Sequence, residues 1–220
     1  MMSLSILAGL SLLILGESHL TITGSLIDAL HDDLTRQGAK VHSIGACGAS
    51  AQDWLVQKKV DCGADRVGKG RPVIRGADAS TTPISTLIAA DKPDVVVIII
   101  GDTMASYDKS AFPKTWAWQS VTSLTKAIAD THTRCVWVGP PWGTPGGKYK
   151  KNDARVQLMS RFLATNVAPC DYVDSLKFSK PGEWKTVDGQ HFTVAGYKAW
   201  GSAITQALAN SPALKEAHGK

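Results

Sequence analysis

The feature that most constrains the fold is an unbroken run of six β-branched residues, VVVIII at positions 95–100, between Pro93 and Gly101. β-Branched residues favour extended backbone, and this run lacks the polar alternation of a strand that has one face in water. A continuous apolar strand is typical of a parallel sheet that is buried on both faces. We therefore expect residues 95–100 to form a central strand of such a sheet.

The rest of the chain alternates short apolar runs with segments of helical spacing. Strands that alternate with helices predict an α/β fold with a parallel sheet covered on both faces. We expect further strands at residues 12–15, 41–44, 135–138 and 172–173, and helices at residues 25–37, 116–131, 153–164 and 193–210.

The length of 220 residues fits one domain that spans residues 1–220. Two parts of it lack a periodic pattern. Residues 61–83 are rich in Gly, Arg and Asp, so we expect a long surface loop there. Residues 212–220 are expected to be a frayed polar tail.

Composition and charge exclude several classes of protein. A hydrophobic share of 44% and a charged share of 20% exclude a disordered or collagen-like chain. The net charge of +5 without a clustered basic stripe does not predict a nucleic-acid partner. The apolar run at residues 4–15 is shorter than the roughly 20 residues of a membrane-spanning helix, so no stable membrane insertion is expected. We interpret it as a buried strand, with a signal-sequence remnant as the alternative.

The residues that follow the strands carry the chemistry, because ligands of parallel sheets bind beyond the carboxyl ends of the strands. Ser18 follows the first strand at a strand-to-helix turn, where backbone N–H groups face a developing oxyanion. Asp188 and His191 lie three residues apart before the last helix, so that the carboxylate can orient the ring that activates a serine. No pair of His, Cys or carboxylate residues has the spacing of a metal site, so no metal is expected.

Each of these residues also has a purely structural interpretation. Ser18 alone is equally compatible with a helix N-cap, and His191 with a hydrogen-bonded core histidine. Gly48 after the second strand is compatible with a simple turn. The catalytic interpretation depends on these residues occurring together and in this order.

The ordered set of motifs resembles the SGNH or GDSL-type hydrolases over nearly the whole chain. Residues 16–18 (GES) resemble the Gly-Asp-Ser block, with Glu in place of Asp, and Gly48 matches the oxyanion-hole glycine. Residues 188–191 (DGQH) are similar to the Asp-x-x-His block, and residues 139–141 (GPP) to a Gly-Pro-Pro stretch of many members. The resemblance implies a flavodoxin-like three-layer α/β/α sandwich with a five-stranded parallel sheet. It also implies a Ser18–His191–Asp188 triad that requires no cofactor.

One block departs from the family pattern. The family has Gly-x-Asn after the third strand, and the Asn side chain donates to the oxyanion. This chain has Gly101-Asp102-Thr103, so that Ser18, Gly48 and Thr103 would form the oxyanion hole. A Thr hydroxyl still donates one hydrogen bond, whereas the Asp102 carboxylate would repel the oxyanion.

The four cysteines permit two disulfides. The strand order of the family implies that Cys135 and Cys170 open neighbouring strands, close enough for a bridge. Cys47 and Cys62 flank a loop that a second bridge would close. Two bridges would predict a periplasmic or secreted protein, whereas four buried thiols would fit a cytoplasmic one.

Aromatic and basic side chains near the strand ends have two interpretations. Trp142 and Trp118 either line a substrate groove, where their faces suit sugar rings, or pack in the core. The basic segment at residues 148–151 (KYKK) is expected to be a solvated loop.

The sequence predicts hydrolysis of a short-chain, acetyl-type carboxylic ester through an acyl-enzyme. Members of the resembled family commonly deacylate carbohydrates, lipids or small esters. The chain has no extensive apolar lid segment, which favours an O-acyl group on a saccharide or polysaccharide. The alternatives are an O-acyltransferase with the same triad, and a non-catalytic glycan-binding member that the Thr103 departure would explain.

Overall fold

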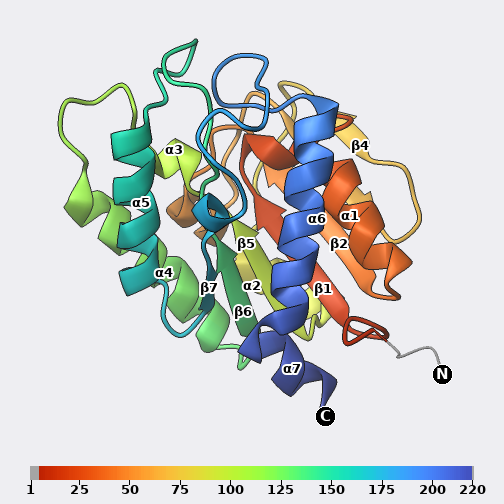
Figure 1. Cartoon of the computed structure of the whole chain (residues 1–220). Coiled ribbons are helices and arrows are strands. Elements are labelled where there is room, and N and C mark those ends of the chain that lie inside the picture. Colours follow the sequence, from red (N-terminus) through yellow and green to blue (C-terminus); the bar gives the residue numbers. More distant parts are fainter. Residues whose placement is uncertain (1–4, 220) are drawn as a thin grey trace.

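The computed structural model describes residues 5–219, which form one seven-stranded sheet with helices on both faces (Figure 1). The strands are β1 (Ser11–Gly16), β2 (Lys40–Ala46), β3 (Gly63–Val67), β4 (Val73–Arg75), β5 (Val95–Ile99), β6 (Arg134–Val138) and β7 (Asp171–Val173). The α-helices are α1 (Leu26–Arg36), α2 (Ile84–Asp91), α3 (Asp102–Ala105), α4 (Lys114–Ala129), α5 (Asp153–Asn166), α6 (Val194–Asn210) and α7 (Pro212–His218). Three 3-10 helices complete the chain: η1 (Ser18–Leu20), η2 (Ala51–Leu55) and η3 (Ser175–Lys177).

Five parallel strands form the body of the sheet, in the order β2-β1-β5-β6-β7. This flavodoxin-like order confirms the predicted fold class. Every residue of β5 is buried, as the apolar run predicted, because the strand lies between β1 and β6 and under both helical layers. In register, Leu13 of β1 is paired with Val96 of β5.

Two helical layers bury the two faces of the sheet. Alternate residues of β1 point to opposite faces, as the backbone of a strand requires. Leu12 and Ile14 belong to the core under α1, α6 and α7, where Trp200 is fully buried. Leu13 and Leu15 belong to the core under α2, α4 and α5. Figure 1 shows α1 and α6 side by side on the first of these faces.

The expected loop at residues 61–83 is wrong in part, and the sheet has seven strands instead of five. β3 pairs antiparallel with β2, and β4 pairs antiparallel with β3 at the edge of the sheet. The sequence of β3, GADRV, lacks the apolar run of a central strand, because only its first two residues, Gly63 and Ala64, are buried. Pairing with β2 and the burial of Ala64 in the core together order this segment.

The expected frayed tail is also wrong for the part that the structure describes. Residues 212–218 form helix α7, whose N-cap Ser211 accepts a hydrogen bond from the Leu214 N–H. Ala213, Leu214 and Ala217 are buried against the core beside α6. These apolar positions recur with the spacing of one helix face, which explains why a polar-looking tail is ordered.

Within residues 5–219, no helix combines the length and the apolar character that crossing a membrane requires.

Candidate active site

Ser18 lies at the carboxyl end of β1, where the chain turns directly into η1. The turn packs closely against β2. A Cβ atom at position 45 would lie only 2.6 Å from the carbonyl oxygen of Leu20. Only glycine at position 45 permits this approach. The close packing fixes Ser18, the first residue of η1, beyond the carboxyl end of β1.

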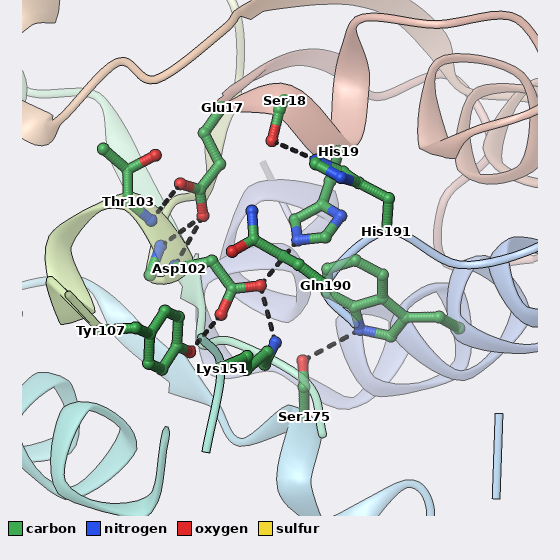
Figure 2. Close-up of polar contacts among 12 residues, drawn as sticks. Glu17, Ser18, His19, Asp102, Thr103, Tyr107, Lys151, Ser175, Gln190 and His191 are labelled. Atoms are coloured by element: carbon green, nitrogen blue, oxygen red, sulfur yellow. Dashed lines mark hydrogen bonds and ion pairs between the residues drawn. The ribbon is translucent and has the colours of Figure 1, made fainter. Parts of the chain in front are cut away.

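The structure brings the three predicted triad residues together from the two ends of the chain (Figure 2 shows Ser18 and His191). The Ser18 hydroxyl donates to Nε2 of His191 over 2.7 Å, and Nδ1 of His191 donates to Oδ2 of Asp188 over 2.7 Å. The other oxygen of Asp188 accepts the backbone N–H groups of His191 and Gln190 at 2.8 and 3.0 Å. The carboxylate therefore orients both the ring and the loop that carries it.

The pKa values of the pair suit a proton relay. Partial burial alone would raise the pKa of Asp188, but hydrogen bonds from His191 and from the Gln190 N–H lower it, so this carboxyl stays ionised. Burial lowers the pKa of His191, the nearby His19 ring lowers it further, and Asp188 opposes both effects. A histidine with a lowered pKa is neutral near pH 7 and free to accept the serine proton.

A pocket of about 720 Å³ opens over the triad. It combines polar and apolar lining, which is typical of a ligand site. Its lining includes Ser18, His191 and Asp188 of the triad, Gly48 and Thr103, the apolar residues Ile22 and Val187, and the charged residues Asp61, Asp108, Lys148 and Lys150.

Gly48 lies at the mouth of the pocket, in a turn after β2. Its φ of +66° belongs to the left-handed region that favours glycine. Among residues 5–219, no group accepts a hydrogen bond from its N–H. The Cys47–Cys62 disulfide holds the preceding residue. Gly48 therefore keeps an unpaired backbone donor in the pocket that Ser18 also lines, and its oxyanion role stays a prediction.

Glu17 has a structural role that the sequence did not reveal. The side chain is 1% exposed and accepts the backbone N–H groups of Gly101, Asp102 and Thr103 at 2.8, 2.8 and 2.6 Å. Burial raises the pKa of this carboxyl, and Asp102 raises it further. Glu17 therefore ties the nucleophile turn to the turn after β5, so the Thr103 N–H is not available to a substrate.

Asp102 lines the pocket but is almost fully buried. Its carboxylate is 2% exposed and accepts hydrogen bonds from Nε2 of His19 at 2.8 Å and Nζ of Lys151 at 2.7 Å. The Tyr107 hydroxyl donates to the other oxygen (Figure 2). Burial alone would raise the pKa of Asp102, but Lys151 and His19 lower it. The ion pair with Lys151 offsets the negative charge that was expected to repel an oxyanion.

Lys151 corrects the expectation of a solvated basic loop at residues 148–151. Lys148 and Lys150 are exposed, but Lys151 is 1% exposed and paired with Asp102. The backbone of this loop also bonds the triad loop, because the Lys148 N–H donates to the carbonyl of Asp188 at 3.2 Å. The ion pair therefore anchors one wall of the pocket.

The structure places neither Trp142 nor Trp118 in the pocket, which corrects the expectation of a tryptophan-lined groove. The indole N–H of Trp142 donates to the Leu176 carbonyl at 2.9 Å, and the ring packs against the core. Trp118 lies on α4 and is half exposed, away from the pocket lining. Tyr107 and Tyr149 are the tyrosines that line the pocket, and the ring of Tyr149 meets that of His191 at 5.2 Å between centroids.

Both predicted disulfides are present. Cys135 at the start of β6 pairs with Cys170 just before β7, with 4.6 Å between Cα atoms. Cys47 pairs with Cys62 over a Cα separation of 5.2 Å. In the part of the chain that the structure describes, no group of three or more His, Cys, Asp or Glu residues is arranged to hold a metal ion.

Comparison with known proteins identifies a sequence relative and several structures of the same fold. No protein-family model matches the chain. Protein BcsX of Komagataeibacter xylinus is 45% identical over 219 residues, which are 97% of this chain and 82% of that protein.

Three solved structures share the fold at low sequence identity. A DUF4886 family protein from Bacteroides uniformis is 14% identical, with a TM-score of 0.61 over 95% of this chain and 91% of that one. A GDSL-like lipase from Bacteroides thetaiotaomicron is 15% identical, with a TM-score of 0.58 over 90% and 86%. An acetyl xylan esterase is 13% identical, with a TM-score of 0.56 over 90% and 98%. The chain thus belongs to the family of protein BcsX and has the fold of the SGNH and GDSL-type hydrolases.

Proposed function

We propose that this protein is a serine esterase that removes a short-chain, acetyl-type acyl group from a saccharide or polysaccharide. The observation that carries the proposal is the unbroken hydrogen-bond path from the Ser18 hydroxyl through His191 to Asp188, at the floor of an open pocket. A hydroxyl, a neutral imidazole and an orienting carboxylate in this order are the parts of an acyl-transfer site.

The first half of the reaction forms an acyl-enzyme. Ser18 Oγ attacks the acyl carbonyl carbon while its proton passes to Nε2 of His191, and Asp188 stabilises the imidazolium. The carbonyl oxygen becomes an oxyanion, for which the N–H groups of Ser18 and Gly48, two residues that line the pocket, are the backbone donors. The ester C–O bond then breaks, and His191 returns its proton to the departing sugar hydroxyl.

The second half releases the acyl group as a carboxylic acid. Water enters the pocket, gives its proton to His191 and attacks the acyl carbon. Collapse of the second oxyanion breaks the bond to Ser18, and His191 returns the proton to Oγ. The first and the last of these proton transfers move along the 2.7 Å contact between Ser18 and His191.

Two observations support a saccharide ester as the substrate. The pocket is open and mixes apolar residues such as Ile22 and Val187 with charged ones at its mouth, which suits a small acyl group on a polar carrier. The acetyl xylan esterase of the same fold acts on such an ester. The two disulfides favour a periplasmic or secreted location, because such bonds persist in oxidising compartments.

Turnover of p-nitrophenyl acetate and of acetylated xylan, with and without a free saccharide acceptor, tests this function. Release of free acetate that disappears in Ser18→Ala and His191→Ala is the expected result. Transfer of the acetyl group to the added saccharide would instead establish the acyltransferase alternative.

The absence of the family's Asn at position 103 favours one further candidate, a glycan-binding member without activity. Binding of xylan by a protein that turns over neither ester would support that candidate and contradict the esterase.

A further inference from the structure

Gln190 is a mostly buried residue whose carboxamide lies in the pocket and has no hydrogen-bond partner among the described residues. The residue is 6% exposed and belongs to the lining of the pocket. Its backbone N–H is bonded to Asp188, but no hydrogen bond reaches its side-chain amide from any residue in the range 5–219. The carboxamide is not among the fully buried side-chain atoms that lack a partner, so it opens onto the pocket. Its N–H groups are therefore available to a ligand.

The position of this carboxamide directs it at the reacting atoms. Figure 2 shows it between Ser18 and Asp102, with its nitrogen on the side of Ser18. Two backbone bonds fix the residue that carries it, because Asp188 accepts the N–H groups of both Gln190 and His191. The carboxylate that orients the general base therefore also positions the backbone that carries this amide.

The site otherwise lacks a side-chain amide donor. Thr103 gives its backbone N–H to Glu17 over 2.6 Å, and Figure 2 shows its hydroxyl beside the same carboxylate. A carboxylate is a stronger acceptor than a neutral carbonyl, so it competes for this hydroxyl. Among the described residues that line the pocket, Gln190 is the one with a carboxamide.

We propose that the Gln190 side-chain N–H is the third oxyanion donor, in place of an amide at position 103. As Ser18 attacks, the carbonyl oxygen gains its negative charge and accepts hydrogen bonds from the N–H groups of Ser18, Gly48 and the Gln190 carboxamide. No proton is transferred to or from Gln190. The inference rests on the proposed esterase function and names a catalytic residue within it.

The Gln190→Leu variant tests the proposal, because leucine retains much of the volume and removes the donor. Loss of one oxyanion donor lowers kcat by about 10²–10³-fold, so we expect that loss with little change in KM. The rate at which a fluorophosphonate modifies Ser18 should fall in parallel, because that reaction also develops charge on oxygen. Gln119→Leu, at an exposed position on α4, is the matched control and should leave both rates unchanged.

The double variant Gln190→Leu/Thr103→Asn separates an electrostatic role from a structural one. It returns a carboxamide to the pocket from a different loop. We therefore expect its kcat to be about tenfold or more above that of Gln190→Leu. A loss that Thr103→Asn does not relieve would assign Gln190 a structural role and overturn the proposal.

Two further results would contradict it. One is a kcat of Gln190→Leu within about threefold of the wild type, because the loss of an oxyanion donor should lower kcat far more than that. The other is an effect confined to KM. If the wild-type protein itself neither hydrolyses esters nor reacts at Ser18, the proposed function fails and this inference with it. If the wild type is active and Gln190→Leu matches it, this inference alone fails.

Discussion

Two aspartate–histidine pairs lie side by side in this protein, with their imidazole centroids 5.3 Å apart. In one, Asp188 binds Nδ1 of His191 at 2.7 Å, and in the other, Asp102 binds Nε2 of His19 at 2.8 Å. The contacts are nearly equal, but the second ring nitrogens differ in their partners. That of His191 meets the Ser18 hydroxyl in the pocket, whereas that of His19 meets the buried Tyr197 hydroxyl.

The comparison shows that surroundings, and not the pair itself, decide the role. The Asp188 pair has an open pocket beside it and a hydroxyl that can react. The Asp102 pair is enclosed, and Lys151 and Tyr107 saturate its carboxylate. We therefore expect the first pair to control activity and the second to control the stability of the pocket wall.

The largest expected effect is that of Asp188→Asn on activity. The amide leaves His191 without its orienting carboxylate and favours the wrong tautomer, and the same change in a well-studied serine protease lowers kcat about 10⁴-fold. Steady-state kinetics on p-nitrophenyl acetate measures the loss, and chemical denaturation should show a much smaller effect on stability. Wild-type kcat in Asp188→Asn would contradict the assignment.

Asp102→Asn should have the opposite profile. It leaves the Lys151 ammonium buried without a counter-charge, and breaking a buried pair in this way costs about 3–5 kcal/mol of unfolding free energy. Urea unfolding measures this cost. The double variant Asp102→Asn/Lys151→Met removes both charges and should regain part of the loss.

An exposed ion pair provides the control for that measurement. Lys126 and Asp130 form a contact of 2.8 Å on the surface of α4. Lys126→Met should cost less than about 1 kcal/mol. An equal cost for Asp102→Asn and Lys126→Met would mean that the buried pair does not support the fold.

The Cys135–Cys170 disulfide joins the amino ends of β6 and β7, at the sheet edge opposite the triad. Replacing both cysteines by serine should lower the unfolding free energy by about 2–4 kcal/mol. Because the bond lies far from the pocket, kcat should be retained. A variant that is as stable as the wild type but inactive would contradict the expectation that this disulfide stabilises the fold and does not affect the active site.

The smallest effect concerns pH. Burial and the nearby His19 ring lower the pKa of His191 from its ordinary value of 6.5, although Asp188 opposes them. The neutral ring that accepts the serine proton is therefore present down to a lower pH than usual. The rise of kcat/KM with pH should have its midpoint below pH 6.5. A midpoint above pH 6.5 would show that the charge of Asp188 dominates.

The sequence predicted what local patterns encode. Residues 95–100 identified the central strand because burial on both faces leaves an apolar run. Asp188 and His191 were recognisable because they lie three positions apart in one loop. Ser18 was recognisable because residues 16–18, just after a strand, resemble the Gly-Asp-Ser block of the family.

Contacts between distant segments were not predictable in this way. Lys151 looks like its solvated neighbours, and only Asp102, 49 positions earlier, explains its burial. Glu17 bonds residues 84 to 86 positions away. Trp142 appeared available to a substrate, but its partner is the backbone of a 3-10 helix further along the chain. The fold, and not the local sequence, brings these groups together.

The most direct test of the central claim is covalent modification of the wild-type protein by a fluorophosphonate, located by peptide mass spectrometry. Because the Ser18 hydroxyl is bonded to His191, we predict that Ser18 is the one modified residue. In the Asp188→Asn variant, we predict that Ser18 is modified much more slowly. Modification of a different residue, or of none, would contradict the assignment of Ser18 as the nucleophile.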